Sequence, residues 1–208
     1  MRPFVLSSSG LYLDQPRQAD VPAIAEYCRD PVFEHFMTLP WPYTRGDAEY
    51  FVEEYVPRGW ATGSELTWAI RLRPAEPLLG AIGLRLVNAD LGFWLGAPHR
   101  GKGYMPEAVH LVTEWVFTSG FAGLSAVNWE CVIGNTASLS VARKSGFTFT
   151  GGAPCLVTAR DGSHPDAWHG VLRRGDDAAA KPGWPLVPPA APVSPDPLPA
   201  ESEGDAGR

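Results

Sequence analysis

Three strand-like runs follow one another between residues 66 and 95, and they restrict the fold more than any other feature. The runs at 66–72, 78–87 and 89–95 are rich in β-branched, aromatic and leucine residues, and short segments with proline or asparagine/aspartate turn signals separate them. Such short connections join antiparallel neighbours, because a parallel crossover needs a dozen or more residues. The middle of the chain is therefore predicted to form an antiparallel meander, which does not fit the βαβ unit of a dinucleotide-binding fold.

Helical patterns flank this meander on both sides. Thr44 followed by Asp47 resembles a capping box ahead of an amphipathic helix, and Asp20 lies where an earlier helix is predicted to begin. The remaining predicted elements are helices at 105–116 and 136–145 and strands at 11–14, 124–133, 147–150 and 166–173. This order of elements predicts an α/β (α+β) fold built on one sheet.

The C-terminal stretch 175–208 differs in composition from the rest of the chain. It holds eight of the 21 prolines and six acidic residues against two basic ones, and its apolar residues have no regular period. Such a segment cannot offset its ordering entropy by burial. We therefore expect a domain at 1–174 followed by a disordered acidic tail at 175–208, in which Trp184 is the single aromatic residue that could dock.

Charge and hydropathy exclude several classes of protein. The net charge is -6, and most of it lies in the tail, so a nucleic-acid partner is not expected. The chain has neither the roughly 18 to 20 consecutive apolar residues of a membrane span nor a signal-peptide pattern at its start. These features predict a cytoplasmic protein without a membrane partner.

No metal site is expected from the cysteine and histidine residues. The three cysteines are too scattered for a disulfide framework or a zinc pair: Cys28, Cys131 and Cys155. His164 and His169 lie close together in the sequence, but their spacing fits no zinc pattern and a strand would place them on opposite faces.

A glycine-rich turn at residues 100–105, here called the glycine turn, joins the meander to the next helix. Two glycines at a strand-to-helix turn let backbone N–H groups approach an anion, and the helix N-terminus adds a partial positive charge. Arg100 and Lys102 add charge that can pair with phosphate. The turn is predicted to hold a pyrophosphate, although an ordinary glycine-rich connector is the alternative, and the chain has no GxxxxGK[ST] phosphate loop.

The glycine turn also resembles a family signature. Arg100-x-x-Gly103-x-Met105 resembles the Q/R-x-x-G-x-G/A motif with which the GNAT N-acetyltransferases bind the pyrophosphate of acetyl-CoA. In the same order along the chain, 89–95 resembles the family's fourth strand, 134–138 the asparagine after its fifth strand, and 144–147 its KxGF helix end. With 39–44 upstream, the pattern is similar to the RimJ/RimL-like branch, and the likeness covers roughly residues 9–174.

The resemblance implies a GNAT fold, in which about four helices flank a mixed, largely antiparallel sheet. It implies acetyl-CoA as co-substrate, no metal, and direct transfer of the acetyl group to an amine acceptor by a monomer or homodimer. The residues that would hold acetyl-CoA are Arg100, Gly101, Lys102, Gly103, Tyr104 and Met105 in the glycine turn, Trp94 and Leu95 in the strand before it, and Asn135 and Ser138 beside the later helix.

Two positions depart from the family pattern. Met105 stands where the signature prefers glycine or alanine, so its side chain is expected to turn into the core. Ala142 stands where many members carry the tyrosine that protonates the departing thiolate. Ser138 is the substitute proton donor, or only a helix cap, and Asp90 is the candidate base through water, or only a turn residue, with Glu130 as the competing carboxylate.

Three functions remain open from the sequence. The acceptor is either a protein N-terminus or a small amine such as an antibiotic or polyamine, and a non-catalytic acyl-CoA-binding module is the third reading. The apolar, proline-punctuated segment at 36–43 either walls an acceptor site or serves local packing.

Overall fold

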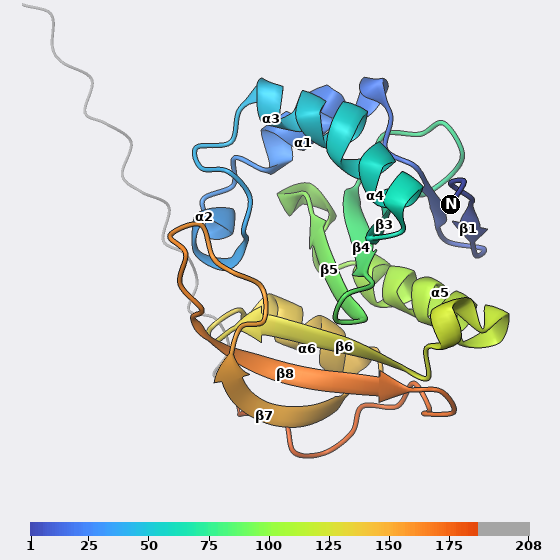
Figure 1. Ribbon diagram of the computed structural model, residues 1–208, viewed down its shortest axis with the longest axis vertical. Helices are drawn as coiled ribbons and strands as arrows, with labels where there is room; N and C mark the ends of the chain where they lie inside the picture. Colours follow the sequence, from blue (N-terminus) through green and yellow to red (C-terminus); the bar gives the residue numbers. More distant parts are fainter. Residues whose placement is uncertain (187–208) are drawn as a thin grey trace, which may run out of the picture.

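The computed structural model describes residues 1–186, and it is built on one eight-stranded sheet of order β1-β2-β3-β4-β5-β6-β8-β7 (Figure 1). The strands are β1 (Leu6–Ser7), β2 (Tyr12–Asp14), β3 (Glu65–Arg71), β4 (Gly80–Arg85), β5 (Asp90–Leu95), β6 (Ala126–Val132), β7 (Thr148–Pro154) and β8 (Asp166–Arg173). Every neighbouring pair is antiparallel except β5 and β6, which are parallel. The predicted α/β fold with a largely antiparallel sheet is confirmed.

The helices follow the predicted order, with one addition. They are α1 (Val21–Tyr27), α2 (Val32–Phe36), α3 (Arg45–Tyr50), α4 (Val56–Thr62), α5 (Tyr104–Ser119) and α6 (Thr136–Lys144). Helix α2 is the addition, and the second predicted helix continues through α3, a π-helical turn at Phe51–Tyr55, and α4. The capping box is present, because Thr44 Oγ1 accepts from the N–H of Asp47 at 3.3 Å while Asp47 Oδ2 accepts from the N–H of Thr44 at 2.8 Å. The short helix α2 was not predicted, since a five-residue helix carries too little periodicity to be recognised.

The sheet opens between its two parallel strands. β5 and β6 are paired only at Asp90 and Asn128, where the N–H of Asn128 donates to the carbonyl of Ala89 at 2.7 Å. In contrast, β4 and β5 are paired along six residues. Beyond Asp90 the two parallel strands diverge toward their carboxyl ends, as Figure 1 shows, so a gap separates them inside the sheet.

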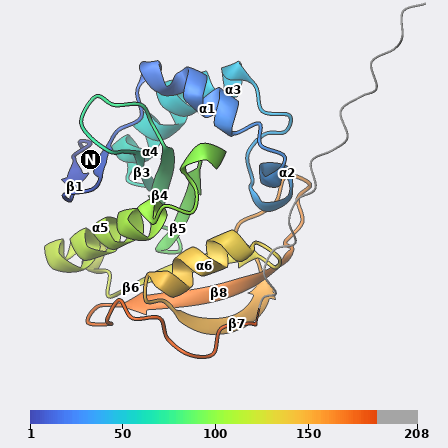
Figure 2. The ribbon, with the colours of Figure 1, turned by 180° about the vertical axis from the view of Figure 1, so that it is seen from behind.

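Two apolar clusters cover opposite faces of the sheet around this gap. Leu91 and Leu95 of β5 belong to the main core, which includes Met105 and the buried side of α5. Trp94 points the other way and packs with Phe33 in the second cluster, beneath α1 and α3. Seen from behind, α5 and α6 lie in front of the sheet (Figure 2). Successive side chains of β5 therefore face two different layers of the protein.

One aromatic residue beyond the expected C-terminal boundary, Trp184, is buried. Trp184 is 8% exposed, and its ring centroid lies 5.8 Å from that of Trp129 and 5.5 Å from that of Phe149. The domain boundary at residue 174 stays a prediction, but Trp184 packs on the core, because one buried aromatic side chain offsets the ordering of a segment that is otherwise poor in apolar residues. The rest of the expected tail, 187–208, lies outside the described residues.

None of the helices in residues 1–186 is long and apolar enough to cross a membrane.

Candidate functional site

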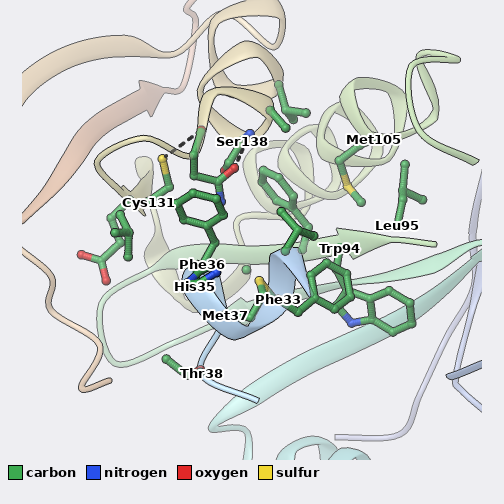
Figure 3. A pocket seen from close by; sticks show the side chains of 18 of the residues that line it. Phe33, His35, Phe36, Met37, Thr38, Trp94, Leu95, Met105, Cys131 and Ser138 are labelled. Carbon is green, nitrogen blue, oxygen red and sulfur yellow. Dashed lines mark hydrogen bonds between the residues drawn. The ribbon is translucent and has the colours of Figure 1, made fainter. Parts of the chain in front are cut away.

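A pocket of about 710 Å³ occupies the gap between β5 and β6. Its lining includes Leu91 and Leu95 from one face of β5 and Gly92 and Trp94 from the other, so the pocket passes through the sheet. The glycine turn and the start of α6 line one side, while α2 and the β7–β8 loop (residues 155–165) line the other. In Figure 3, the α2 side chains Phe33 and Phe36 face the pocket that also contains Ser138. Two molecules that enter from opposite faces can therefore meet in the gap.

The glycine turn has the geometry of an anion site. Gly101 and Gly103 have φ angles of +75° and +84°, and a Cβ at either position would meet nothing within 4 Å. Gly103 is the N-cap of the 16-residue helix α5, and no side chain caps that helix end. The first backbone N–H groups of α5 thus point toward a space that is open to a ligand, and the helix dipole favours negative charge there.

Arg100 lines the pocket, and two of its three guanidinium nitrogens already donate within the protein. Its Nε donates to the carbonyl of Leu95 at 3.0 Å, its Nη1 donates to Asp30 at 2.7 Å, and its Cζ lies 5.2 Å from the centroid of the Phe33 ring. Arg100 therefore fastens the glycine turn to the segment between α1 and α2. The contacts disfavour the predicted pairing of Arg100 with phosphate, because its guanidinium already has a carboxylate partner.

Two other side chains of the glycine turn, those of Lys102 and Met105, lie in different surroundings. Lys102 is exposed and is not among the pocket-lining residues. Met105 is 3% exposed within the main core, so its side chain turns inward as expected and leaves the glycine turn open.

Asn135 and Ser138 form a connected group at the start of α6. Asn135 Oδ1 accepts from the N–H of Ser138 at 3.1 Å, so Asn135, rather than Ser138, caps this helix. Ser138 Oγ accepts from Trp129 Nε1 at 3.0 Å and lines the pocket. Because the indole can only donate, the hydroxyl hydrogen of Ser138 remains available for a partner in the pocket. This geometry favours the proton-donor role over the capping role.

The hydrogen-bond register of β5 shows which way the backbone N–H groups of Trp94 and Leu95 point, the two residues of this strand that are expected to hold acetyl-CoA. The N–H of Gly96 donates to the carbonyl of Leu79, the residue just before β4, at 2.9 Å, so this N–H points toward the β4 side of the strand. Alternate residues of an antiparallel strand direct their N–H groups to the same neighbour, so the amide of Trp94 also faces β4. The N–H of Leu95 therefore faces the gap. Of Trp94 and Leu95, only Leu95 can donate a backbone hydrogen bond to a group held there.

The two candidate carboxylates are not brought together in the pocket. Asp90 is 2% exposed, pairs with Arg85 through Nε at 2.9 Å, and is not among the pocket-lining residues. Glu130 does line the pocket, where its oxygens accept from the N–H groups of Leu156 at 2.9 Å and Val157 at 3.0 Å. The role predicted for Asp90 as a base is therefore disfavoured, since its charge serves to hold Arg85 at the pocket wall.

The pocket cysteines are not activated. Burial raises the pKa of Cys131 to about 12 and that of Cys155 to about 11, so both thiols are protonated near neutral pH. A protonated thiol is a poor nucleophile, which argues against an acyl-cysteine intermediate. Within residues 1–186, no group of three potential ligand side chains could hold a metal ion.

Some pocket residues were not predicted from the sequence. Segment 36–43 was considered as an acceptor wall, and Phe36 and Met37 do line the pocket. Arg85 and the β7–β8 loop were not considered, because neither carries a local motif and each reaches the pocket only through strand pairing.

Comparison with known proteins agrees with this geometry. The model of the GNAT acetyltransferase domain family matches residues 10–148. A search of curated proteins finds no match.

Solved structures share the fold at low sequence identity. A ribosomal-protein-serine acetyltransferase from Vibrio cholerae has a TM-score of 0.70 at 18% identity, covering 83% of this chain and 99% of its own. RimL, a ribosomal-protein N-acetyltransferase solved with coenzyme A, has a TM-score of 0.68 at 18% identity, covering 84% and 100%. The microcin self-immunity acetyltransferase MccE, solved with acetyl-CoA and AMP, has a TM-score of 0.66 at 18% identity, covering 80% and 93%.

Proposed function

Because this chain belongs to the GNAT acetyltransferase family and is an N-acetyltransferase, we propose that it moves the acetyl group of acetyl-CoA to a protein N-terminal α-amine. One observation carries the choice of acceptor. Of the carboxylates that line the pocket, Glu130 is the one on the two strands that border the gap, and it already accepts two backbone N–H groups, while Glu34 and Asp161 lie in α2 and the β7–β8 loop. An α-amine has a pKa of about 8, against about 10.4 for a lysine, so it needs less help from a base.

The residues around the gap suit direct transfer. The amides of the glycine turn and the N-terminus of α5 would hold the pyrophosphate of acetyl-CoA, which supplies the thioester. The N–H of Leu95 would donate to the thioester oxygen as negative charge develops there. The amine would reach the carbonyl from the α2 side of the sheet and form the new C–N bond. As the C–S bond breaks, Ser138 would give its hydroxyl proton to the departing sulfur, and the proton that the amine nitrogen loses would return to the Ser138 oxygen.

A small-molecule amine is the second candidate acceptor. The likeness to MccE, whose structure holds acetyl-CoA and AMP, is nearly as strong as the likeness to the ribosomal-protein enzymes. The same pocket could thus serve a compact amine, and the two readings differ in the acceptor alone.

An acceptor screen with radiolabelled acetyl-CoA tests the proposal. The panel holds short peptides with a free α-amine, the same peptides with a blocked N-terminus and one internal lysine, an aminoglycoside and a polyamine. We expect label on the free α-amine and little on the blocked, lysine-containing partner. Label on the small amines alone would make the second candidate correct, while acetyl-CoA binding without label on any acceptor would identify a binding module.

Replacing Ser138 with alanine tests the proton donor. We expect kcat to fall by about 10²-fold, the usual contribution of a general acid, with acetyl-CoA affinity within about threefold of the wild type. Steady-state kinetics and calorimetry measure these quantities. Ser145→Ala is the matched control, because Ser145 ends the same helix, lies outside the pocket lining, and its Oγ has no hydrogen-bond partner in the described part of the chain. An unchanged kcat in Ser138→Ala would assign the proton transfer elsewhere.

A further inference from the structure

One side chain of the β7–β8 loop binds a distant part of the chain. Arg160 Nη1 donates to the carbonyls of Met37 at 3.2 Å and Leu39 at 2.9 Å, and its Nη2 donates to the carbonyl of Glu34. These partners lie 121 to 126 residues away in the sequence. A single guanidinium therefore joins the β7–β8 loop to α2 and to the residues that follow it.

One of the three carbonyls, that of Glu34, lies in the last turn of α2, and the other two, of Met37 and Leu39, follow the helix end. Helix α2 ends at Phe36, and the last carbonyls of any α-helix have no partner within that helix. A guanidinium presents five donors in one plane, and its positive charge is favourable beside the negative end of a helix. With only five residues, α2 is too short to be stable without such outside partners.

Both segments that Arg160 joins are walls of the same pocket. Residues 32–38 line it from α2, and residues 157, 159–161, 163 and 165 line it from the β7–β8 loop. Glu130 fixes the start of this loop by accepting the N–H groups of Leu156 and Val157. Glu130 therefore holds the first residues of the loop, and Arg160 connects the middle of the loop to the α2 segment.

We propose that Arg160 is a positioning residue that determines acceptor specificity by holding the two walls of the acceptor side together. This inference rests on the proposed function, since it describes how that pocket receives an amine. With the walls joined, the acceptor must enter between α2 and the β7–β8 loop as a slender chain end, such as an extended peptide N-terminus. Without the guanidinium, the carbonyl of Glu34 in α2 and those of the residues after the helix lose this partner, and the pocket-facing rings of Phe33 and Phe36 lose their fixed position.

Hydrogen exchange of the full chain tests the contact itself, independently of activity. In Arg160→Ala we expect the amides of residues 33–39 to exchange at least about tenfold faster, with the amides of β3 to β5 unchanged. Arg174→Ala is the matched control, because Arg174 is also exposed and donates to one distant backbone carbonyl, that of Leu124, at 2.9 Å. Unchanged exchange at 33–39 would overturn the proposal.

Kinetics test the consequence, with the best free-α-amine peptide of the acceptor screen as the probe. In Arg160→Ala we expect the peptide KM to rise about tenfold, while kcat and acetyl-CoA affinity stay within about threefold, and Arg160→Lys should lie between the two. A structural role alone would lower the melting temperature without this split between KM and kcat. If Arg160→Ala does not fold, Arg160→Lys provides both readouts.

The two proposals fail separately. A wild-type chain that acetylates no peptide would refute the proposed function, while hydrogen exchange would still test the contact. A wild-type chain that acetylates the peptide, with an unchanged KM in both Arg160 variants, would refute the role of Arg160 alone.

Discussion

Gly103→Pro is expected to reduce acetyl-CoA affinity by at least about 100-fold, which corresponds to about 2.7 kcal/mol. Proline holds φ near -65°, whereas Gly103 has a φ of +84° at the N-cap of α5. The substitution therefore removes one N–H from the glycine turn and redirects the neighbouring amides. A lost hydrogen bond to a charged group costs about 1.5–3 kcal/mol, and the redirected amides add to that loss. Isothermal calorimetry measures the affinity.

Gly120→Pro provides the matched control for this variant. Gly120 ends the same helix, and its φ of +66° gives proline the same conformational conflict. We expect both variants to lose stability but only Gly103→Pro to lose acetyl-CoA binding. Full affinity in a Gly103→Pro protein with native circular dichroism would show that the glycine turn does not hold the co-substrate.

Trp184→Ala is expected to lower the free energy of unfolding by about 3–5 kcal/mol, the usual loss when a buried tryptophan is truncated. Trp184 packs on Trp129 and Phe149, so alanine would leave a cavity beside the core. For a protein of this size, such a loss lowers the melting temperature by roughly 6–20 °C. Thermal unfolding followed by circular dichroism measures the change.

Leu186→Ala is the control for this prediction, because Leu186 lies two residues further along and is fully exposed, with a relative exposure of 101%. Its truncation should leave the melting temperature unchanged. A second contact supports the same conclusion: a Cβ on Gly146 would lie 2.4 Å from the carbonyl of Asp177, so the C-terminal segment runs closely over the end of α6. A Trp184→Ala protein as stable as the wild type would support the domain boundary at residue 174.

The features that the sequence predicted well are those that depend on near neighbours in the chain. The capping box joins Thr44 to Asp47 within one helical turn, and strand β8 was predicted over the same residues that the structure shows. The glycine turn also follows from a strand, two glycines and a helix in succession. Residue preference and periodicity determine such features, because the interacting groups lie within a few positions of one another.

The contacts that the side chains of those elements make depend on how the chain packs. Arg100 lies in the signature but pairs with Asp30, 70 residues away, and Asp90, which is not a lining residue, pairs with Arg85 at the pocket wall. Trp184 joins the core because the sheet register brings Trp129 and Phe149 to the place where the C-terminal segment passes. The order of the elements and the glycine turn thus follow from local sequence. The partners of Arg100, Asp90 and Trp184 depended on chain packing, because contacts between distant residues leave no periodic pattern in a single sequence.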